Sequence, residues 1–535
     1  MSRVIIIGAG IAGLATAGLL ARAGHDVHVV EKNAHVGGRA GNLDAEGFRF
    51  DTGPSWYLLP RVFDHFFELM GTSTRAQLDL VPLDPGYRVF AEPVPGALPA
   101  ETVTVPRGRD RVIELFDSLE PGAGQRLREY LRSAAHTTDM AEKHFLYNPF
   151  SRLSTLTHPE ILRSLPELTK LLLTSLEDHA AASFKHPVLR QILGYPAVFL
   201  GTEPARAPAI YHLMSAMDLD EGVQYPRGGF AAVVESLKKL ALDHGARITC
   251  QAEAQRILVS EVASGRPRAR GVQWRDPSGA LHTQSADVVV SGADLHHTET
   301  TLVEAPYRTY PQRWWRRRTS GPGGVLVMLG VRGSLEQLPH HGLFFARDWK
   351  RNFGDIFGPS PRVPAPASFY VCRPSATDDA VAPPEHENLF VLVPVPADPS
   401  LGSGGADGHG DPAVERAADA AIALISEWAG ISDLGERIVV RQTKGPQDFL
   451  RDFHSWRGGM LGPGHTLGQS AMFRARNASR KVAGLYYAGA TTSPGVGVPM
   501  CLISAELVVK RILGDHSAGP LPTPLKPHTD AGGRG

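Results

Sequence analysis

A glycine-rich turn near the N-terminus constrains the fold of this chain more than any other feature. Gly8, Gly10 and Gly13 lie between the apolar run 4–7, which predicts a buried strand, and residues 11–23, which predict a helix rich in Ala and Leu. In such a turn the first glycine permits the sharp bend, and the second lets the backbone approach a pyrophosphate. The third lets the helix pack closely against the strand. The segment therefore predicts the start of a dinucleotide-binding βαβ unit.

The residues that follow indicate which dinucleotide the unit binds. A second strand is predicted over 26–30, and Glu31 at its end is placed to accept hydrogen bonds from ribose hydroxyls and to repel a 2′-phosphate. Gly37 and Gly38 then let the chain pass close to a cofactor, and Arg39 can meet its phosphates or ring. An extended dinucleotide with a flavin needs this second layer of contacts, whereas a dissociable nicotinamide does not. We therefore expect FAD.

Composition and charge exclude several other classes of protein. The 535 residues include 55 Lys plus Arg and 55 Asp plus Glu, so a net charge of zero provides no attraction to nucleic acid. Three scattered cysteines without a Cys-x-x-Cys pair argue against a disulfide framework or a zinc site and fit a reducing cytoplasm. Because the pair His340-His341 has no further ligands at metal-binding spacing, no metal is expected. Glycines interrupt the first apolar run, which disfavours a secretory signal.

Later segments have patterns that belong to the same nucleotide-binding unit. Strand character is found over 247–259, 286–290 and 484–488, with a helical stretch and a turn expected between the first two. A helix is predicted to begin at Pro499, which suits a first helical turn, and to end at Gly514.

Between these segments the composition changes. Residues 110–200 are Leu-rich and predict helices, whereas residues 323–400 alternate like an antiparallel sheet. We therefore predict an α/β protein in which a Rossmann-like FAD-binding lobe is interleaved with a mixed-sheet and helical substrate lobe. The predicted domains are a discontinuous FAD-binding domain of residues 1–70, 225–300 and 480–515, a substrate and membrane-facing domain of residues 71–224 and 301–479, and a disordered tail of residues 516–535.

The segment 494–499 reads Pro-Gly-Val-Gly-Val-Pro and stands directly before the last predicted helix. Its small residues allow a flavin ring to lie against the backbone, and the helix N-terminus would face the ring edge where negative charge collects on reduction. Together with the glycine turn, Glu31 and Arg39, this segment resembles the bacterial and fungal type of phytoene desaturase, in the flavin amine oxidase superfamily. Further matches are residues 51–55, 225–230, 340–341, 377–378, 382–383, 393–396 and 469–474, and the resemblance covers nearly everything from residue 3 to 514.

The resemblance implies a cofactor site drawn from several parts of the chain. Its adenosine end would contact a strand near Ala254, where the family commonly has Val, and its flavin end would contact the C-terminal segment. Arg227 stands in a Pro-Arg-Gly-Gly turn, where a surface position and a contact with flavin or substrate are equal alternatives. No catalytic residue is assigned. The candidate cofactor-binding residues are Gly8, Gly10, Ala12, Gly13, Glu31, Lys32, Gly38, Arg39, Gly53, Pro54, Ser55, Arg227, Ala254, Gly489, Ala490, Gly495, Gly497, Val498 and Pro499.

The resemblance further implies FAD-dependent dehydrogenation of phytoene, stepwise toward lycopene. An allylic C–H bond would give a hydride to flavin N5, and loss of a proton from the next carbon would complete each new double bond. Only one dinucleotide fingerprint is visible, so the electrons are expected to come from the substrate and to pass to quinone or oxygen. A long apolar polyene as substrate implies a cytoplasmic protein that is peripheral on the inner face of the membrane. No nucleic acid is expected as a partner, and the oligomeric state stays open.

The sequence also allows other interpretations. Another carotenoid-modifying flavoenzyme, such as an isomerase, a 3,4-desaturase or a ketolase, would share the same motifs. A module that binds prenylated proteins, like the Rab GDP-dissociation inhibitors, would share the fold. The Leu-rich stretch 161–176 is expected to be a core helix, although an apolar substrate must enter somewhere in this lobe. Residues 314–318 read either as an ordinary amphipathic helix end or as a membrane-surface anchor.

Overall fold

Parallel pairing of the first two predicted strands starts the fold. The computed structural model describes residues 1–94, 100–151 and 158–527, and β1 (Arg3–Ile7), α1 (Ile11–Arg22) and β2 (Asp26–Val30) form the predicted βαβ unit. The two strands pair in register from Arg3↔Asp26 to Ile7↔Val30. Because α1 is apolar on all sides, it is buried along nearly its whole length, as expected of a helix enclosed by its neighbours.

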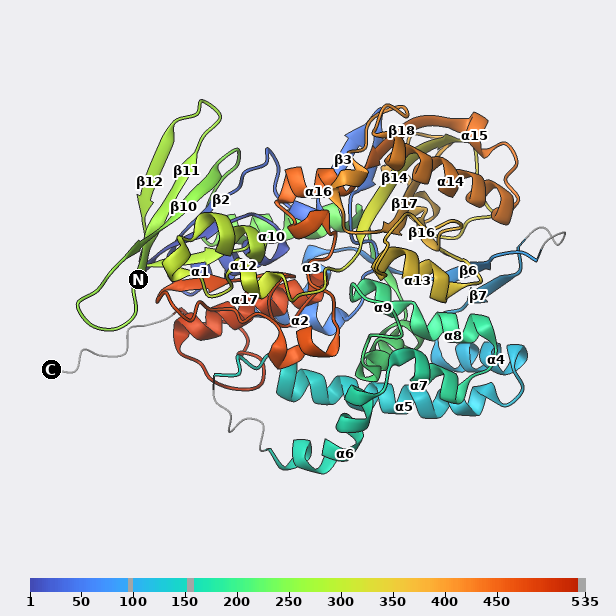
Figure 1. Ribbon diagram of the computed structural model, residues 1–535, viewed down its shortest axis with the longest axis horizontal. Coiled ribbons are helices and arrows are strands. Elements are labelled where there is room, and N and C mark those ends of the chain that lie inside the picture. The colour runs from blue at the N-terminus through green and yellow to red at the C-terminus, as the bar shows by residue number, and fades with distance from the viewer. Residues whose placement is uncertain (95–99, 152–157, 528–535) are drawn as a thin grey trace.

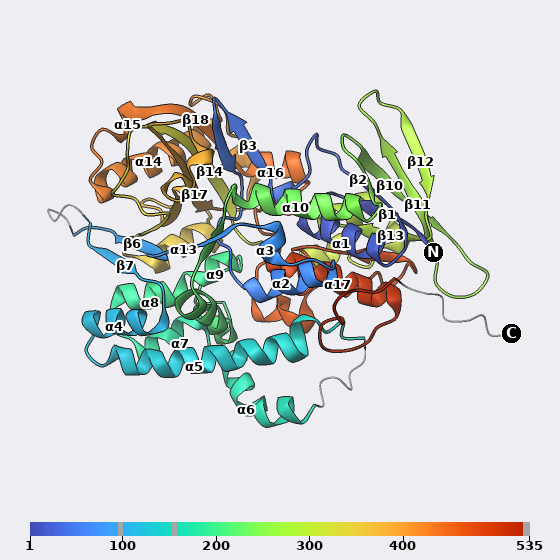
Figure 2. The ribbon, with the colours of Figure 1, turned by 180° about the vertical axis from the view of Figure 1, so that it is seen from behind.

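Segments far apart in the chain complete a five-stranded parallel sheet around this unit. Its order is β19-β13-β1-β2-β9, with β9 (Arg247–Thr249), β13 (Val288–Ser291) and β19 (Leu485–Tyr487). α10 (Gly229–Asp243) and α17 (Val498–Leu513) both contact α1 (Figures 1 and 2). The sheet therefore joins the N-terminal turn to the loop that precedes α17.

The region between β9 and β13 differs from the expectation. An antiparallel sheet of β10 (Glu253–Ser260), β11 (Arg268–Arg275) and β12 (Leu281–Ser285) replaces the expected helical stretch. The single strand expected over 247–259 is also wrong. The chain breaks at Gln251, which has a positive φ of 54°, so that β9 and β10 join different sheets. The alternation of buried and exposed residues in β11 is the strand signal that the helical interpretation overlooked.

The second large sheet of the molecule is mixed and has seven strands (Figure 1). Its pairs are antiparallel except β15 with β6, which confirms the antiparallel pattern expected over 323–400. α14 (Pro412–Ala429) contacts four of its strands. In sheet order the strands are β18 (Ile438–Lys444), β14 (Gly323–Arg332), β17 (His386–Val395), β16 (Phe369–Cys372), β15 (His341–Phe345), β6 (Tyr87–Ala91) and β7 (Thr102–Val105).

Helices between residues 109 and 199 lie along one side of this mixed sheet (Figures 1 and 2). They are α4 (Arg109–Leu119), α5 (Ala123–Ala141), α6 (Pro159–Leu173), α7 (Leu176–Ser183), α8 (Pro187–Gly194) and α9 (Pro196–Phe199). The remaining helices and strands are β3 (Asn42–Ala45), β4 (Phe48–Asp51), α2 (Pro60–Leu69), α3 (Thr74–Gln77), β5 (Leu80–Pro82), β8 (Gln224–Pro226), α11 (Leu295–His297), α12 (Gln312–Trp315), α13 (Trp349–Phe357), α15 (Leu434–Arg437) and α16 (Pro446–Phe453). The α/β class is confirmed, whereas the proposed domain boundaries stay predictions.

α6 is not the core helix that its leucines suggested. Only Ile161 and Leu171 are buried, and Leu162, Leu165 and Leu173 are 54%, 51% and 74% exposed. Figures 1 and 2 show the reason, since α6 lies at the edge of the molecule beyond α5. No helix in the described residues is long and apolar enough to cross a bilayer.

Two further expectations about surface segments are corrected. Trp315 is 1% exposed and its indole N–H donates to the Tyr310 carbonyl, so the membrane-anchor interpretation of 314–318 is wrong for this side chain. The chain after α17 is not disordered from residue 516. Residues 516–527 return to the body, where Leu521 and Leu525 are buried, and residues 528–535 lie outside the described residues.

Candidate functional site

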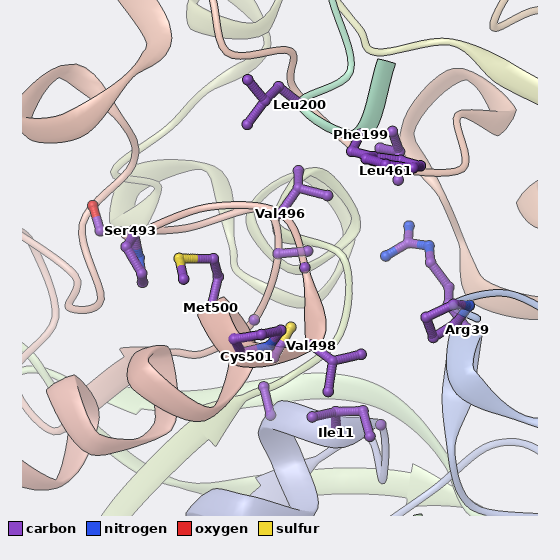
Figure 3. A pocket seen from close by; sticks show the side chains of 18 of the residues that line it. Ile11, Arg39, Phe199, Leu200, Leu461, Ser493, Val496, Val498, Met500 and Cys501 are labelled. Carbon is purple, nitrogen blue, oxygen red and sulfur yellow. The ribbon is translucent and has the colours of Figure 1, made fainter. Parts of the chain in front are cut away.

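One cavity of about 640 Å³ connects the N-terminal glycine turn, the Gly38-Arg39 segment and the loop before α17 (Figure 3). Of the nineteen candidate cofactor residues, Gly13, Arg227 and Gly495 do not line it. The candidates that do are Gly8, Gly10, Ala12, Glu31, Lys32, Gly38, Arg39, Gly53, Pro54, Ser55, Ala254, Gly489, Ala490, Gly497, Val498 and Pro499. The tertiary structure thus brings together residues separated by up to 491 positions, from Gly8 to Pro499.

The glycine turn has the geometry of a phosphate cradle. Gly8 has a φ of +93°, where a side chain would be strained. A Cβ on Gly13 would lie 2.0 Å from the Gly8 carbonyl oxygen, which explains why Gly13 supports packing although it does not line the cavity. A Cβ on Gly10 would meet nothing nearer than 3.9 Å and would fill part of the space at the start of α1. The free N–H groups of that helix terminus are suited to a pyrophosphate.

Glu31 holds the cradle in shape. The side chain is 5% exposed, and its two oxygens accept hydrogen bonds from the backbone N–H groups of Ala9 at 2.7 Å and Asn33 at 2.8 Å. Its own carbonyl accepts from Ala252 N–H, which brings the segment before Ala254 to the same end of the cavity. This geometry fits the adenosine end of a dinucleotide, while the ribose contact itself stays a prediction.

Arg39 points into the cavity (Figure 3). Its guanidinium lies 3.6 Å from the buried carboxylate of Asp294, donates to the Ser455 hydroxyl and sits 6.0 Å from the Phe453 ring centre. Asp294 compensates the cationic charge, and the planar guanidinium is thereby held against the wall. Asp294 could not be predicted from the sequence, because nothing near Arg39 in the chain indicates this partner.

The loop before α17 forms the opposite end of the site. Gly495 and Gly497 have φ values of +151° and +118°, so the chain turns sharply before Val498. A Cβ on Gly495 would lie 2.2 Å from the His465 ring, and this glycine therefore provides space for the histidine instead of lining the cavity. Val498 and Cys501 project into the open space that Ile11 borders from the other side (Figure 3).

His465 holds this loop in place by a hydrogen bond. Val496 N–H donates to its Nε2 at 3.3 Å, so Nδ1 carries the hydrogen and donates to the Tyr211 hydroxyl oxygen at 2.7 Å. Burial holds the pKa of His465 well below its usual value, and the ring is therefore neutral near pH 7. His465 and Tyr211 both line the cavity, but neither belongs to a motif that the sequence analysis recognised.

Arg474 supports the same loop with a buried charge. It donates to the carbonyls of Thr492 at 3.0 Å, Pro463 at 3.2 Å and Ala490 at 2.6 Å. Burial lowers the pKa of Arg474 to about 10, which leaves it protonated near pH 7. A cation behind this end of the cavity stabilises negative charge that develops inside it.

Beyond the loop the cavity becomes apolar. Leu467, Met472 and Phe473 line it and are also 40%, 46% and 59% exposed, so they mark its mouth. Leu168 and Leu172 of α6 also line the cavity, although Leu162, Leu165 and Leu173 of the same helix are exposed. Other apolar lining residues, several of which are shown in Figure 3, are Phe145, Leu146, Phe199, Leu200, Ile210, Leu213, Met214, Met217 and Leu461.

Arg227 lies at the surface, which was one of the two alternatives for this residue. Its guanidinium lies 3.2 Å from the Asp79 carboxylate and donates to the Thr377 carbonyl, and about half of the side chain is exposed. Because it does not line the cavity, the structure gives no support to a contact with flavin or substrate.

Comparisons with known proteins agree with this geometry. The model of the flavin containing amine oxidoreductase family matches residues 11–513. The carotenoid 3,4-desaturase of Haloarcula japonica is 38% identical over 96% of this chain and 98% of its own length. The zeta-carotene-forming phytoene desaturase of Myxococcus xanthus is 30% identical over 99% and 97%. The structure of a putrescine oxidase bound to putrescine has a TM-score of 0.59 at 14% identity, covers 96% of this chain and 99% of its own, and shows the shared fold.

Proposed function

The chain belongs to the flavin containing amine oxidoreductase family, and on this premise we propose that it desaturates phytoene stepwise toward lycopene. It is an FAD-dependent oxidoreductase that acts on CH–CH groups and resembles carotenoid desaturases along its whole length. This favours an enzyme over a module that binds prenylated proteins. When bound, FAD supplies the acceptor for the two electrons removed from the substrate.

The observation that carries the proposal is the apolar continuation of the cofactor cavity. A hydrocarbon polyene offers no polar group for recognition, so a long wall of Leu, Met and Phe side chains is the chemistry that selects it. The charged side chains that line the cavity gather at the other end, around Glu31 and Arg39, and are Glu31, Lys32, Arg39, Glu253, Asp294 and Asp452. The two ends therefore suit a dinucleotide and a hydrocarbon, respectively.

Residues around the loop before α17 set the charge and polarity at the end of the cavity where the reaction would occur. Arg474 and the N-terminus of α17 place positive charge behind this loop, and a helix terminus contributes on the order of 1 kcal/mol to stabilising a nearby negative charge. His465 and Tyr211 hold the loop with neutral groups, and the surrounding apolar side chains exclude water. The proton that leaves the substrate is not assigned to any side chain.

The mouth of the cavity supports a peripheral position on a membrane. Leu467, Met472 and Phe473 at the mouth and the exposed leucines of α6 present apolar surface where a bilayer-dissolved substrate would enter. We place this surface on the cytoplasmic face of the membrane. Quinone or oxygen would then reoxidise the cofactor.

Reconstitution tests the proposal directly. FAD-loaded protein is added to liposomes that contain phytoene, with quinone or oxygen and without NAD(P). We expect the absorption of the extracted polyene to shift to longer wavelength as conjugation grows. An unchanged phytoene spectrum with both electron acceptors would contradict phytoene desaturation.

One observation favours a second candidate, 3,4-desaturation of a carotenoid that is already conjugated. Identity to the Haloarcula japonica 3,4-desaturase, 38%, exceeds the 30% identity to the Myxococcus xanthus phytoene desaturase. Parallel liposomes that contain lycopene separate the two candidates. Conversion of lycopene without conversion of phytoene would assign 3,4-desaturation, and product analysis would also reveal an isomerase or a ketolase.

A further inference from the structure

Three metal-binding side chains converge in the mixed sheet, outside the residues that line the cavity. His341 begins β15, His340 immediately precedes it, and Cys372 ends β16, the neighbouring antiparallel strand. The strand register places His341 directly opposite Cys372. One donor atom from each residue lies within 4.8 Å of the other two, and the side chains are only 5%, 0% and 3% exposed.

Both imidazoles have one nitrogen satisfied and one unsatisfied. Nδ1 of His340 lies 2.7 Å from the Thr377 hydroxyl oxygen, and Nδ1 of His341 lies 2.7 Å from the Tyr370 hydroxyl oxygen. Within the described part of the chain, Nε2 of each ring is buried without a hydrogen-bond partner. A buried nitrogen without a partner costs about 1–3 kcal/mol, so two of them in rings whose centres lie 4.5 Å apart require a physical reason.

Metal-bound histidines have this arrangement. A ligating imidazole commonly donates its second N–H to an oxygen, which fixes the tautomer and leaves the other nitrogen with a free lone pair. Here the hydroxyls of Thr377 and Tyr370 are placed to accept from Nδ1. Both Nε2 atoms are then acceptors without a donor among the described residues, and one bound cation would satisfy both.

We propose that His340, His341 and Cys372 form a binding site for a thiophilic d¹⁰ cation, Zn²⁺ or Cu⁺. Three atoms within 4.8 Å of one another surround a point no more than about 2.8 Å from each, and Zn–N and Zn–S bonds of about 2.0–2.3 Å require each to move by less than about 1 Å. The set of two imidazoles and one thiol, without a carboxylate, disfavours Mg²⁺ and Ca²⁺. On binding, the Cys372 thiol releases its proton to solvent and the thiolate offsets one positive charge.

The site would position one wall of the cavity. Trp56 stacks on His341 with ring centres 4.6 Å apart and planes 15° apart, and the Tyr370 hydroxyl bridges His341 and the Ser55 hydroxyl at 2.7 Å each. Trp56, Tyr370 and Ser55 all line the cavity. Fixing His341 to Cys372 therefore holds these three side chains in place without contact between the metal and the substrate.

Metal analysis of FAD-loaded protein tests the proposal. The protein is produced without a histidine tag in medium supplemented with zinc and copper, and metal and flavin are measured per chain. We expect about one equivalent of zinc or copper in the unmodified protein and its loss in Cys372→Ser and His340→Asn. Cys250→Ser is the matched control, because Cys250 is another free cysteine outside the cluster, and it should retain the metal. The element detected distinguishes Zn²⁺ from Cu⁺.

A spectroscopic measurement on the unmodified protein keeps the test independent of variant folding. After dialysis against a chelator, Co²⁺ is added. We expect a thiolate-to-cobalt charge-transfer band in the near ultraviolet for the unmodified protein and for Cys250→Ser. Absence of bound zinc and copper in the unmodified protein, together with absence of this band, would overturn the proposal. Retention of full metal content by a folded Cys372→Ser variant would overturn it as well.

Discussion

At the residue scale, the missing side chain of Gly13 sets how closely α1 approaches the turn. An added Cβ would lie 2.0 Å from the Gly8 carbonyl oxygen, closer than any non-bonded contact allows. The helix would have to move away from the cradle, and its terminal N–H groups would move with it. The position of these groups, more than the stability of the helix, is therefore what Gly13 protects.

Gly13→Ala should weaken FAD binding at least about tenfold, equivalent to about 1.4 kcal/mol. Gly354→Ala is the matched control, because an added Cβ in α13 would meet nothing within 4 Å. Fluorescence titration of the FAD-free proteins measures both affinities. Equal affinity in the two variants would show that the close packing of α1 on the turn is not required.

Asp218 is a second residue whose surroundings determine its behaviour. The hydroxyls of Tyr87 at 3.1 Å and Tyr195 at 2.5 Å both donate to its Oδ2, while Oδ1 has no partner among the described residues. Burial raises the pKa of Asp218 from 3.8 to about 7. Since the pKa in the folded state exceeds that in the unfolded state, the folded state binds the proton more tightly, and stability falls as pH rises from about 4 to about 7.

Asp218→Asn should remove this component of the pH dependence, because an amide does not ionise. We expect the unmodified protein to lose several degrees more in Tm than the variant between about pH 5 and about pH 8. Thermal unfolding of the FAD-loaded proteins in matched buffers provides the comparison. Parallel Tm curves for the two proteins would contradict the assignment.

At the element scale, α6 places leucines both in the cavity and on the outside of the protein. Leu168 and Leu172 line the cavity, whereas Leu162, Leu165 and Leu173 face outward. A helix that is apolar on both sides is unusual at a protein surface, and a bilayer is the surrounding that stabilises it.

Replacing Leu162, Leu165 and Leu173 together by Gln should reduce liposome binding at least about tenfold, because their exposed apolar surface would no longer enter the lipid. The control is Leu242→Gln with Leu281→Gln, which changes exposed leucines of α10 and β12 at 44% and 53% exposure. Co-sedimentation with liposomes measures both. If the control lost as much binding as the α6 variant, the membrane surface would not be specific to α6.

At the scale of the whole molecule, the segment after α17 packs back against the rest of the protein. Lys510 is fully buried, and its ammonium donates to the carbonyls of Tyr147, Ser517 and Gly519 at 2.9, 2.7 and 2.5 Å. Leu525 N–H donates to the Leu69 carbonyl at 3.0 Å, which holds the returning segment against α2. This buried charge depends on the chain beyond the helix for two of its three carbonyl partners.

Truncation after Asp515 should lower the Tm of the FAD-loaded protein by several degrees, because Lys510 keeps its charge and loses two of these carbonyls. Lys510→Met should destabilise the full chain but restore part of the stability of the truncated chain. Thermal unfolding of the four proteins tests this coupling. Additive effects of truncation and substitution would contradict it.

The sequence by itself determined the features that depend on neighbouring residues. The Gly8–Gly13 turn, the helix that follows it and the helix between Val498 and Leu513 are local, because glycine conformation, helix capping and hydrophobic periodicity act within a few residues. These features predicted the α/β class, and together with Glu31 and the Gly37-Gly38-Arg39 segment they predicted FAD. Sixteen candidates that line the cavity were named from these motifs and from the resemblance to a known family.

Only the tertiary structure decided which distant residues meet. Asp294 beside Arg39, His465 behind Gly495 and Cys372 opposite His341 have no signal in their local sequence. The three strands after residue 252 and the docked segment 516–527 also depend on the surfaces that receive them. The physical reason is that burial and pairing free energies arise from surfaces assembled across the chain, which override local preference. The glycine turn defines where the cofactor begins, but the fold defines the cavity that continues beyond it.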